Sequence, residues 1–288
     1  MHKSNKPNSY RPMPDIDGLL DKLSRNLALP IIYYVGGEIV TDTETLKIGK
    51  TSTTTIVVAQ LLASIRSSCG TLRYLANSPP EISKGECLFI ARAIIETSIN
   101  AAFILASGDT IARRAIEHAV VKGYKRNDKN VGGFSLKRKL FDVLPEDLEI
   151  LLNEFRNKKG YIKDWTDTKV PGRIEKIHEV FGQRLTSLLS ASYISVYSDA
   201  SEMIHGSLAG AQIKSGAISF GEFDNRILSK GKFGRIEVNH AQNAIYGAFY
   251  SLLAISKIIA KNDKLTSYQT DIYEVYEEFK SLFADDLK

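Results

Sequence analysis

The sequence contains very little cysteine: Cys69 and Cys87 are the only two among 288 residues. Their surroundings are unrelated, which argues against a disulfide framework or a cysteine-based zinc site and fits a reducing cytoplasm. The longest apolar runs, near 56–65 and 245–255, fall short of the ~20 residues that a membrane-spanning helix needs. The polar stretch 1–14 lacks the apolar core of a secretory signal. We therefore expect a cytoplasmic protein with no membrane partner.

Motifs that identify common catalytic centres are also missing. Gly49-Lys50-Thr51 resembles the end of a phosphate-binding loop, but Glu44 occupies the position where that loop requires its first glycine. The histidines at positions 2, 118, 178, 205 and 240 show no metal-ligand spacing. Glu202 and His205 form a Glu-x-x-His pair, but a di-iron bundle needs such pairs on two helices together with a glutamate from each of two others. The sequence predicts no metal and no cofactor, although carboxylates from separate helices could still meet.

What is present is the composition of a large globular domain. Hydrophobic residues make up 43% and charged residues 25%, and a chain of this length can bury roughly 75% of its unfolded surface. Apolar residues recur at helical spacing, which predicts an all-α, multi-helix bundle. We expect a flexible tail over 1–14, one bundle domain over 15–262 and a C-terminal amphipathic helix over 263–288. A glycine-rich loop or short hairpin is expected near 206–236. The predicted helices span 15–29, 52–76, 82–106, 109–126, 173–181, 184–204, 237–261 and 267–283, with a further helix beginning at Pro145.

Within these expected elements, individual residues mark the ends of several helices. Pro30 is expected to stop the first helix, before a short strand or irregular link over 31–40. Ser52 is expected to cap the second helix, which Gly70 interrupts. Asp109 is expected to cap the helix that follows residue 108.

Positive charge is concentrated in one segment, 122–139. Its seven basic residues face one acid, Asp128, so the segment carries +6 in a chain of net charge +5. A basic stretch of this kind can bind phosphates, but a solvated loop is an equally good interpretation. The candidate nucleic-acid-binding residues are Lys122, Lys125, Arg126, Lys137, Arg138 and Lys139.

Two polar stripes cross otherwise apolar helices. Arg92, Glu96 and Asn100 are spaced by four residues in the most apolar helix, so they share one side of it. Burial of unpaired charge is costly, so partners must come from elsewhere. A self-contained Arg92–Glu96 ion pair that fixes the helix packing is the structural alternative.

The second stripe consists of Tyr197, Ser201 and His205, again spaced by four. Asp199 and Glu202 are expected to point elsewhere, into solvent. If the two stripes face each other, they form one polar pocket inside the bundle, with a histidine available for acid–base chemistry. A satisfied core histidine is the alternative.

These motifs, Arg92-x3-Glu96 and Tyr197-x3-Ser201-x3-His205-Gly206-Ser207, resemble an uncharacterised bacterial family of helical proteins, a domain of unknown function (DUF 5677-like). The resemblance covers about residues 53–210. It implies a helical fold and the location of a site, and a broad likeness to HEPN domains, which include RNA-cutting toxins and antiphage effectors. HEPN ribonucleases carry Arg-x4-6-His and cleave RNA without metal.

That spacing occurs here three times. It is found in Arg113-x4-His118, in Arg173-x4-His178 and in Arg235-x4-His240. The pair Arg113 and His118 is preferred as a secondary candidate because it lies on the helix that leads into the basic segment. A solvated helix face is the alternative for this pair.

The function expected on this basis is an intracellular, HEPN-like, metal-independent ribonuclease or nucleotide phosphodiesterase, in a toxin or antiphage context. His205 would be the acid–base group and Arg92 would stabilise phosphate charge, while Glu96 orients Arg92 and Tyr197 and Ser201 position the substrate. RNA would be the partner, together with a second copy of the chain or a controlling protein. The alternative is a non-catalytic binding or assembly module whose polar cluster is structural or binds a small signal.

Overall fold

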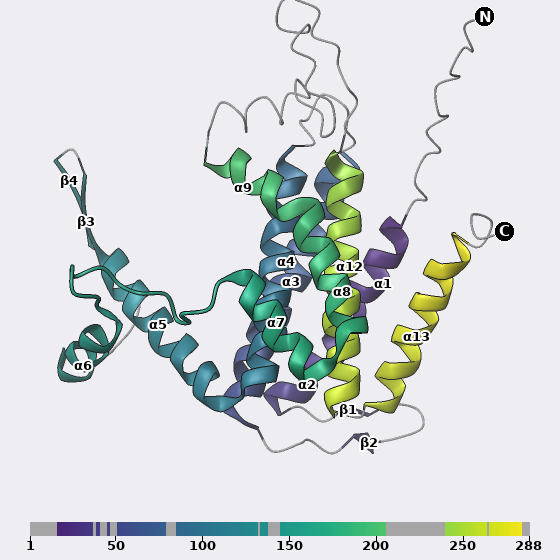
Figure 1. Cartoon of the computed structure of the whole chain (residues 1–288), viewed down its shortest axis with the longest axis horizontal. Coiled ribbons are helices and arrows are strands. Elements are labelled where there is room, and N and C mark those ends of the chain that lie inside the picture. Colours follow the sequence, from purple (N-terminus) through teal and green to yellow (C-terminus); the bar gives the residue numbers. More distant parts are fainter. Residues whose placement is uncertain are drawn as a thin grey trace, which may run out of the picture.

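The computed structural model describes residues 16–36, 39–40, 45–46, 51–78, 85–131, 133–137, 145–205, 240–263 and 265–283. These residues form a multi-helix bundle, which confirms the predicted all-α class (Figure 1). The helices are α1 (Asp17–Asn26), α2 (Ala28–Val35), α3 (Thr53–Ala76), α4 (Glu86–Ser107), α5 (Asp109–Asn127), α6 (Pro145–Phe155), α7 (Val170–Phe181), α8 (Gln183–Ser192), the π-helix η1 (Tyr193–Tyr197), α9 (Ser198–Ile204), α12 (His240–Asp263) and α13 (Thr266–Ser281). The strands form two antiparallel pairs, β1 (Ile39–Val40) with β2 (Thr45–Leu46) and β3 (Asp128–Val131) with β4 (Phe134–Lys137).

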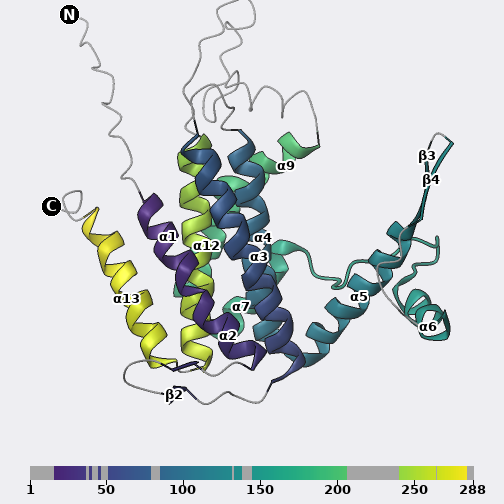
Figure 2. The ribbon, with the colours of Figure 1, turned by 180° about the vertical axis from the view of Figure 1, so that it is seen from behind.

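The centre of the bundle is made by three long helices, α3, α4 and α12, which run side by side in both views (Figures 1 and 2). Apolar side chains occur nearly all round α4 and α12, so both are covered by neighbours on most sides. The shorter helices α1, α7, α8 and α13 pack around them. The sequence pattern had predicted this central position for α4.

The same three helices are long and apolar enough to cross a membrane, by length and composition alone. The expectation of no spanning helix rested on uninterrupted apolar runs. Averaged over 18 residues, however, the hydropathy of α4 reaches 1.7 and that of α3 and α12 reaches 1.3. In the bundle, 78% of the apolar window of α12 is buried against protein.

The predicted cap of α3 is present. Ser52 Oγ accepts a hydrogen bond from the Thr55 amide at 3.2 Å, and Thr55 Oγ1 accepts one from the Ser52 amide at 2.9 Å. This reciprocal pair satisfies two amides that have no partner within the helix. Asp109, by contrast, is the first residue of α5, and its carboxylate accepts hydrogen bonds from the amide and hydroxyl of Thr54 on α3.

Several boundaries differ from prediction. Pro30 does not stop the first helix, because it falls in the first turn of α2, where its missing N–H has no helical partner to lose. Much of the link expected over 31–40 is therefore helical. Gly70 lies inside α3 without interrupting it. The basic segment is the end of α5 followed by the β3–β4 hairpin, not a loop, and the hairpin expected over 206–236 lies outside the described residues.

The C-terminal helix α13 packs against α1 and α12. Lys22 Nζ lies 2.5 Å from Glu278 Oε2, and the hydroxyl of Tyr34 on α2 donates to Asp263 at the end of α12. The buried side chains of α13 and α1 belong to one continuous core. This helix therefore completes the bundle.

Candidate functional site

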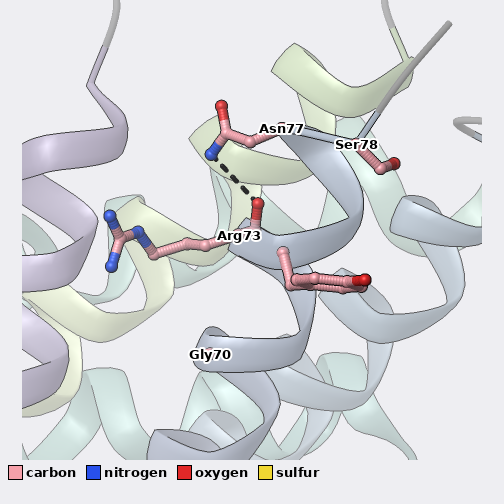
Figure 3. A pocket seen from close by; sticks show the side chains of 5 residues that line it. Gly70, Arg73, Asn77 and Ser78 are labelled. Carbon is pink, nitrogen blue, oxygen red and sulfur yellow. Dashed lines mark hydrogen bonds between the residues drawn. The ribbon is translucent and has the colours of Figure 1, made fainter.

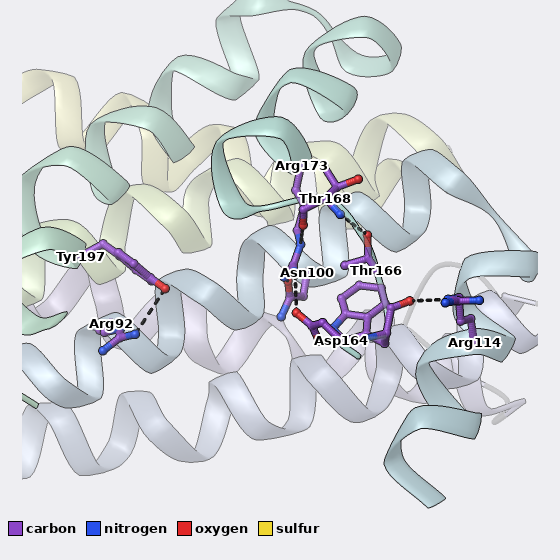
Figure 4. A network of polar contacts seen from close by, with 9 residues as sticks. Arg92, Asn100, Arg114, Asp164, Thr166, Thr168, Arg173 and Tyr197 are labelled. Carbon is purple, nitrogen blue, oxygen red and sulfur yellow. Dashed lines mark hydrogen bonds and ion pairs between the residues drawn. The ribbon is translucent and has the colours of Figure 1, made fainter. Parts of the chain in front are cut away.

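The two polar stripes meet where η1 packs on α4. Arg92 Nη2 donates a hydrogen bond to the Tyr197 hydroxyl at 3.3 Å, and its guanidinium carbon lies 4.5 Å from the centre of the Tyr197 ring (Figure 4). The Tyr193 ring stacks on Tyr197 at 4.7 Å. Arg92 is thus held by the ring face and the hydroxyl of Tyr197, which itself stacks on Tyr193.

A close approach between helices positions η1. A Cβ atom on Gly247 of α12 would lie 2.5 Å from Val196 Cγ2 and 3.3 Å from Ile95 Cδ1, so only glycine lets these three helices approach so closely. Val196 is fully buried in this junction. The continuous α-helix predicted for 184–204 is therefore wrong in detail: it is α8, one π-helical segment and α9. Such π segments widen the turn and often occur at functional sites.

Glu96 lies one turn along α4 from Arg92 and is half-buried. Both residues are described, and no ion pair forms between them, so the proposed self-contained pair and the role of Glu96 in orienting Arg92 are both wrong. Tyr197 holds the guanidinium instead. Arg92 is half-buried, and within the described part of the chain it pairs with no carboxylate.

Ser201 and His205 lie on α9, which packs against α4. Ser201 is half-buried, and its carbonyl accepts a hydrogen bond from the His205 amide at 3.2 Å. His205 ends α9 and is exposed, so it is not a satisfied core histidine.

Asp199 was expected to be solvated, and this is wrong. It is half-buried, and removal of its carboxyl from water raises the pKa of Asp199 to about 6. In the sequence, only the position of Asp199 between Tyr197 and Ser201 could have indicated its burial. Glu202, on the same helix, is exposed as expected.

Asn100 belongs to a different network, centred on the buried Arg173. Arg173 donates to Asn100 Oδ1 at 2.6 Å and to the Thr168 carbonyl at 2.8 Å, and pairs with Asp164 at 3.2 Å (Figure 4). Its guanidinium lies 4.9 Å from the Trp165 ring. The guanidinium thus has three hydrogen-bond partners and a counter-charge within the fold, which gives Asn100 a structural role.

The family comparison covers this whole region. The model of the family of unknown function DUF5677 matches residues 55–215. The chain belongs to that family. The match confirms the predicted resemblance to this family, and its range from residue 55 to residue 215 contains Arg92, Tyr197, Ser201 and His205. Neither the curated proteins nor the solved structures contain a match to the chain.

The secondary candidates Arg113 and His118 do not share a face of α5, because five residues turn a helix by about 140° beyond a full turn. Arg113 is exposed, whereas His118 packs its ring 5.5 Å from that of Phe155. Burial, assisted by Lys122, lowers the pKa of His118. In the second Arg-x4-His motif, His178 contacts Thr186, on the side away from the Arg173 network.

Sequence reasoning overlooked Arg114, which links α5 to the bundle. It donates to the Trp165 carbonyl at 2.9 Å (Figure 4), and it pairs with Glu154 of α6 at 3.3 Å. Its guanidinium also lies 4.9 Å from the Phe155 ring. In the sequence, the single tryptophan, Trp165, followed by polar residues, was the feature that could have indicated this contact.

The basic candidates lie apart from the two stripes. Lys122, Lys125 and Arg126 belong to the end of α5 and Lys137 to β4, while Arg138 and Lys139 lie outside the described residues. Lys122 is exposed.

One open pocket of about 420 Å³ lies at the C-terminal end of α3 and contains none of the predicted site residues (Figure 3). Arg73, the charged residue of its lining, pairs with Asp17 at 2.9 Å and with Asp21. Its charge is already neutralised within the fold. The α4–η1–α9 junction is therefore the better candidate site, and the described residues contain no cluster suited to a metal ion.

Proposed function

We propose that the chain cleaves RNA or a related nucleotide phosphodiester without a metal ion, at the junction of α4, η1 and α9. The observation that supports this proposal is the state of Arg92. Its half-buried guanidinium has five N–H donors, of which one is hydrogen-bonded to Tyr197, and none meets a carboxylate in the described part of the chain. A partly desolvated, unneutralised cation favours an anionic ligand such as phosphate.

In this mechanism His205 acts as general base and takes the proton of the ribose 2′-hydroxyl. The 2′-oxygen attacks phosphorus and the bond from phosphorus to the 5′-oxygen breaks. The departing 5′-oxygen takes up a proton from water, and His205 returns its proton to the solvent, which leaves a 2′,3′-cyclic phosphate and a 5′-hydroxyl. Arg92 stabilises the charge that develops on the phosphoryl oxygens. Ser201 and Tyr197 position the substrate, and the half-buried carboxylate of Glu96 is available for a ribose hydroxyl. The basic end of α5 and the hairpin hold the rest of the RNA backbone.

A second candidate function is a non-catalytic binding or assembly module. The contact that favours it is the same Arg92–Tyr197 pair, because a guanidinium on an aromatic ring also stabilises helix packing. In that case Arg92 fixes η1 on α4, and the chain acts through a partner protein or a second copy of itself.

The test compares wild type with His205→Ala and Arg92→Lys on total RNA, tRNA and single-stranded DNA in the presence of EDTA. His178→Ala and Arg66→Ala are matched controls, because both side chains are exposed and lie outside the junction. Circular dichroism and the melting temperature establish that each variant is folded.

The proposal requires that wild type and both controls cleave RNA, and that folded His205→Ala and Arg92→Lys lose at least 100-fold in rate. Products ending in a 2′,3′-cyclic phosphate would confirm attack by the 2′-hydroxyl. Absence of cleavage by wild type, or equal cleavage by folded His205→Ala, would refute it. A loss of stability in Arg92→Lys with no activity in wild type would favour the assembly module.

A further inference from the structure

The hairpin β3–β4 stands at the end of an arm that leaves the bundle. The arm consists of residues 109–163, with α5 leading outwards and α6 folded back beside it (Figures 1 and 2). It has a small core of its own, formed by Val121, Leu148, Leu152 and Phe155. At the tip of the hairpin, Gly133, Phe134 and Ser135 are exposed, so packing does not account for these residues.

The tip of the hairpin carries an exposed aromatic ring. Phe134 is 84% exposed, the highest value among the exposed large hydrophobic side chains in the described residues. It follows Gly133, whose φ of +84° makes the turn, and lies opposite Val131 in the ladder. A ring in this position contributes little to folding, and its face is free for a ligand.

Basic residues flank this ring in the sequence. The described end of the arm contains five basic residues and one acid, Asp128, a net charge of +4. The five are Lys122, Lys125, Arg126, Lys129 and Lys137. An exposed aromatic among cations is the combination with which proteins bind single-stranded nucleic acids, where the ring stacks on a base and the cations meet phosphates. A duplex offers no unstacked base.

The hairpin lies at the same end of the bundle as the candidate site (Figures 1 and 2). In both views the hairpin and α9 lie at the same end of the long helices, on the same side of the bundle (Figures 1 and 2). Arg114 fastens the base of the arm to the Trp165 segment, which itself joins α4 through Arg173 and Asn100. The hairpin is therefore held on the side of the bundle where RNA would be cleaved.

We infer that the hairpin arm binds a single-stranded segment of RNA, with Phe134 stacking on an unpaired base and the surrounding cations contacting the backbone. This inference rests on the proposed function and specifies its substrate class: unpaired RNA.

The test measures binding of a labelled single-stranded 2′-O-methyl RNA 12-mer by fluorescence anisotropy, with the matching duplex as a second probe. Because the 2′-hydroxyl is blocked, the probe cannot be cleaved. The variants are Phe134→Ala, Phe134→Leu and Phe134→Tyr. Tyr74→Ala is the control, because Tyr74 is also a strongly exposed aromatic residue, 76% exposed, but belongs to the bundle.

We expect Phe134→Ala and Phe134→Leu to weaken single-strand binding by about 5- to 100-fold, and Phe134→Tyr and Tyr74→Ala to bind as wild type does. The dependence on salt should keep its slope in Phe134→Ala and become shallower in Lys122→Ala. All variants should melt at the wild-type temperature.

Two results would overturn the inference: equal affinity for duplex and single strand, or wild-type affinity in Phe134→Leu, which would indicate an apolar protein-docking tip. The outcome is separate from that of the proposed function. Binding of the 12-mer without any RNA cleavage would support the role of the arm and refute the proposed enzymatic activity. Cleavage that depends on His205, without binding of the 12-mer, would support the enzymatic activity and refute the role of the arm.

Discussion

Because α12 packs on η1, a substitution on α12 can perturb the geometry of the candidate site without changing any of its residues. In Gly247→Ala the added methyl would lie 2.5 Å from Val196 Cγ2, well inside van der Waals contact. Overpacking of this kind costs about 1–3 kcal/mol, while replacement of a helical glycine recovers about 1 kcal/mol. We therefore expect the free energy of unfolding to fall by about 0–2 kcal/mol. In the control Gly70→Ala on α3, where nothing lies within 4 Å, it should rise by about 0.5–1 kcal/mol.

The measurement is urea unfolding followed by circular dichroism, in a double-mutant cycle with Val196→Ala. Removal of two buried methyl groups should cost about 2 kcal/mol by itself. In the double variant the clash disappears, so its destabilisation should be at least 1 kcal/mol smaller than the sum of the two single effects. The reasoning fails if Gly247→Ala stabilises as much as Gly70→Ala and couples to Val196→Ala by less than about 0.3 kcal/mol.

Three further predictions concern the Arg173 network, the half-buried carboxyl of Asp199 and the proposed activity. Arg173→Ala should lower the free energy of unfolding by about 3 kcal/mol and shift Trp165 fluorescence to longer wavelength, because a buried hydrogen-bonded guanidinium is lost; unchanged emission and stability would contradict this. The pKa of Asp199 is about 6 when folded, above its usual 3.8, so the folded state binds the extra proton between these values and stability falls as pH rises from about 4 to 6. Asp199→Asn should remove this fall and raise stability at pH 7 by about 1 kcal/mol, after a discount for partial exposure, which thermal melts from pH 4 to 7 would measure. Expression of wild type should slow bacterial growth and His205→Ala should relieve it; equal toxicity of the two would argue against cleavage at this site.

The parts of the fold that the sequence predicted are those determined by local chemistry. The reciprocal hydrogen bonds of Ser52 and Thr55 are encoded within four residues, and α4 is apolar nearly all round because it is central. The two stripes were recognised because helical spacing alone puts polar side chains on one face.

The parts that were mispredicted depend on the context of neighbouring elements. Pro30 reads as a helix stop unless one knows that α2 begins two residues before it, at Ala28. The segment η1 packs where Gly247 leaves space on α12, and residues 184–204 alone give no sign of that contact. Asp199 looks like a surface carboxylate until α9 is packed against α4. Local patterns carry no information about such long-range packing.

The polar stripe of α4 divides into two parts with different chemistry. At the Asn100 end the amide oxygen accepts a hydrogen bond from the buried Arg173, which pairs with Asp164, so the arginine at this end has a counter-charge. At the Arg92 end the guanidinium meets, among the residues that the structure describes, only the ring and hydroxyl of Tyr197, so no carboxylate there neutralises its charge. Arg92 and Arg173, both within the family region, thus differ in counter-charge as well as in burial. We expect the anionic substrate at Arg92, whose charge is not neutralised. If Arg92 served only to make the fold rigid, a carboxylate could have been placed beside it, as Asp164 is beside Arg173.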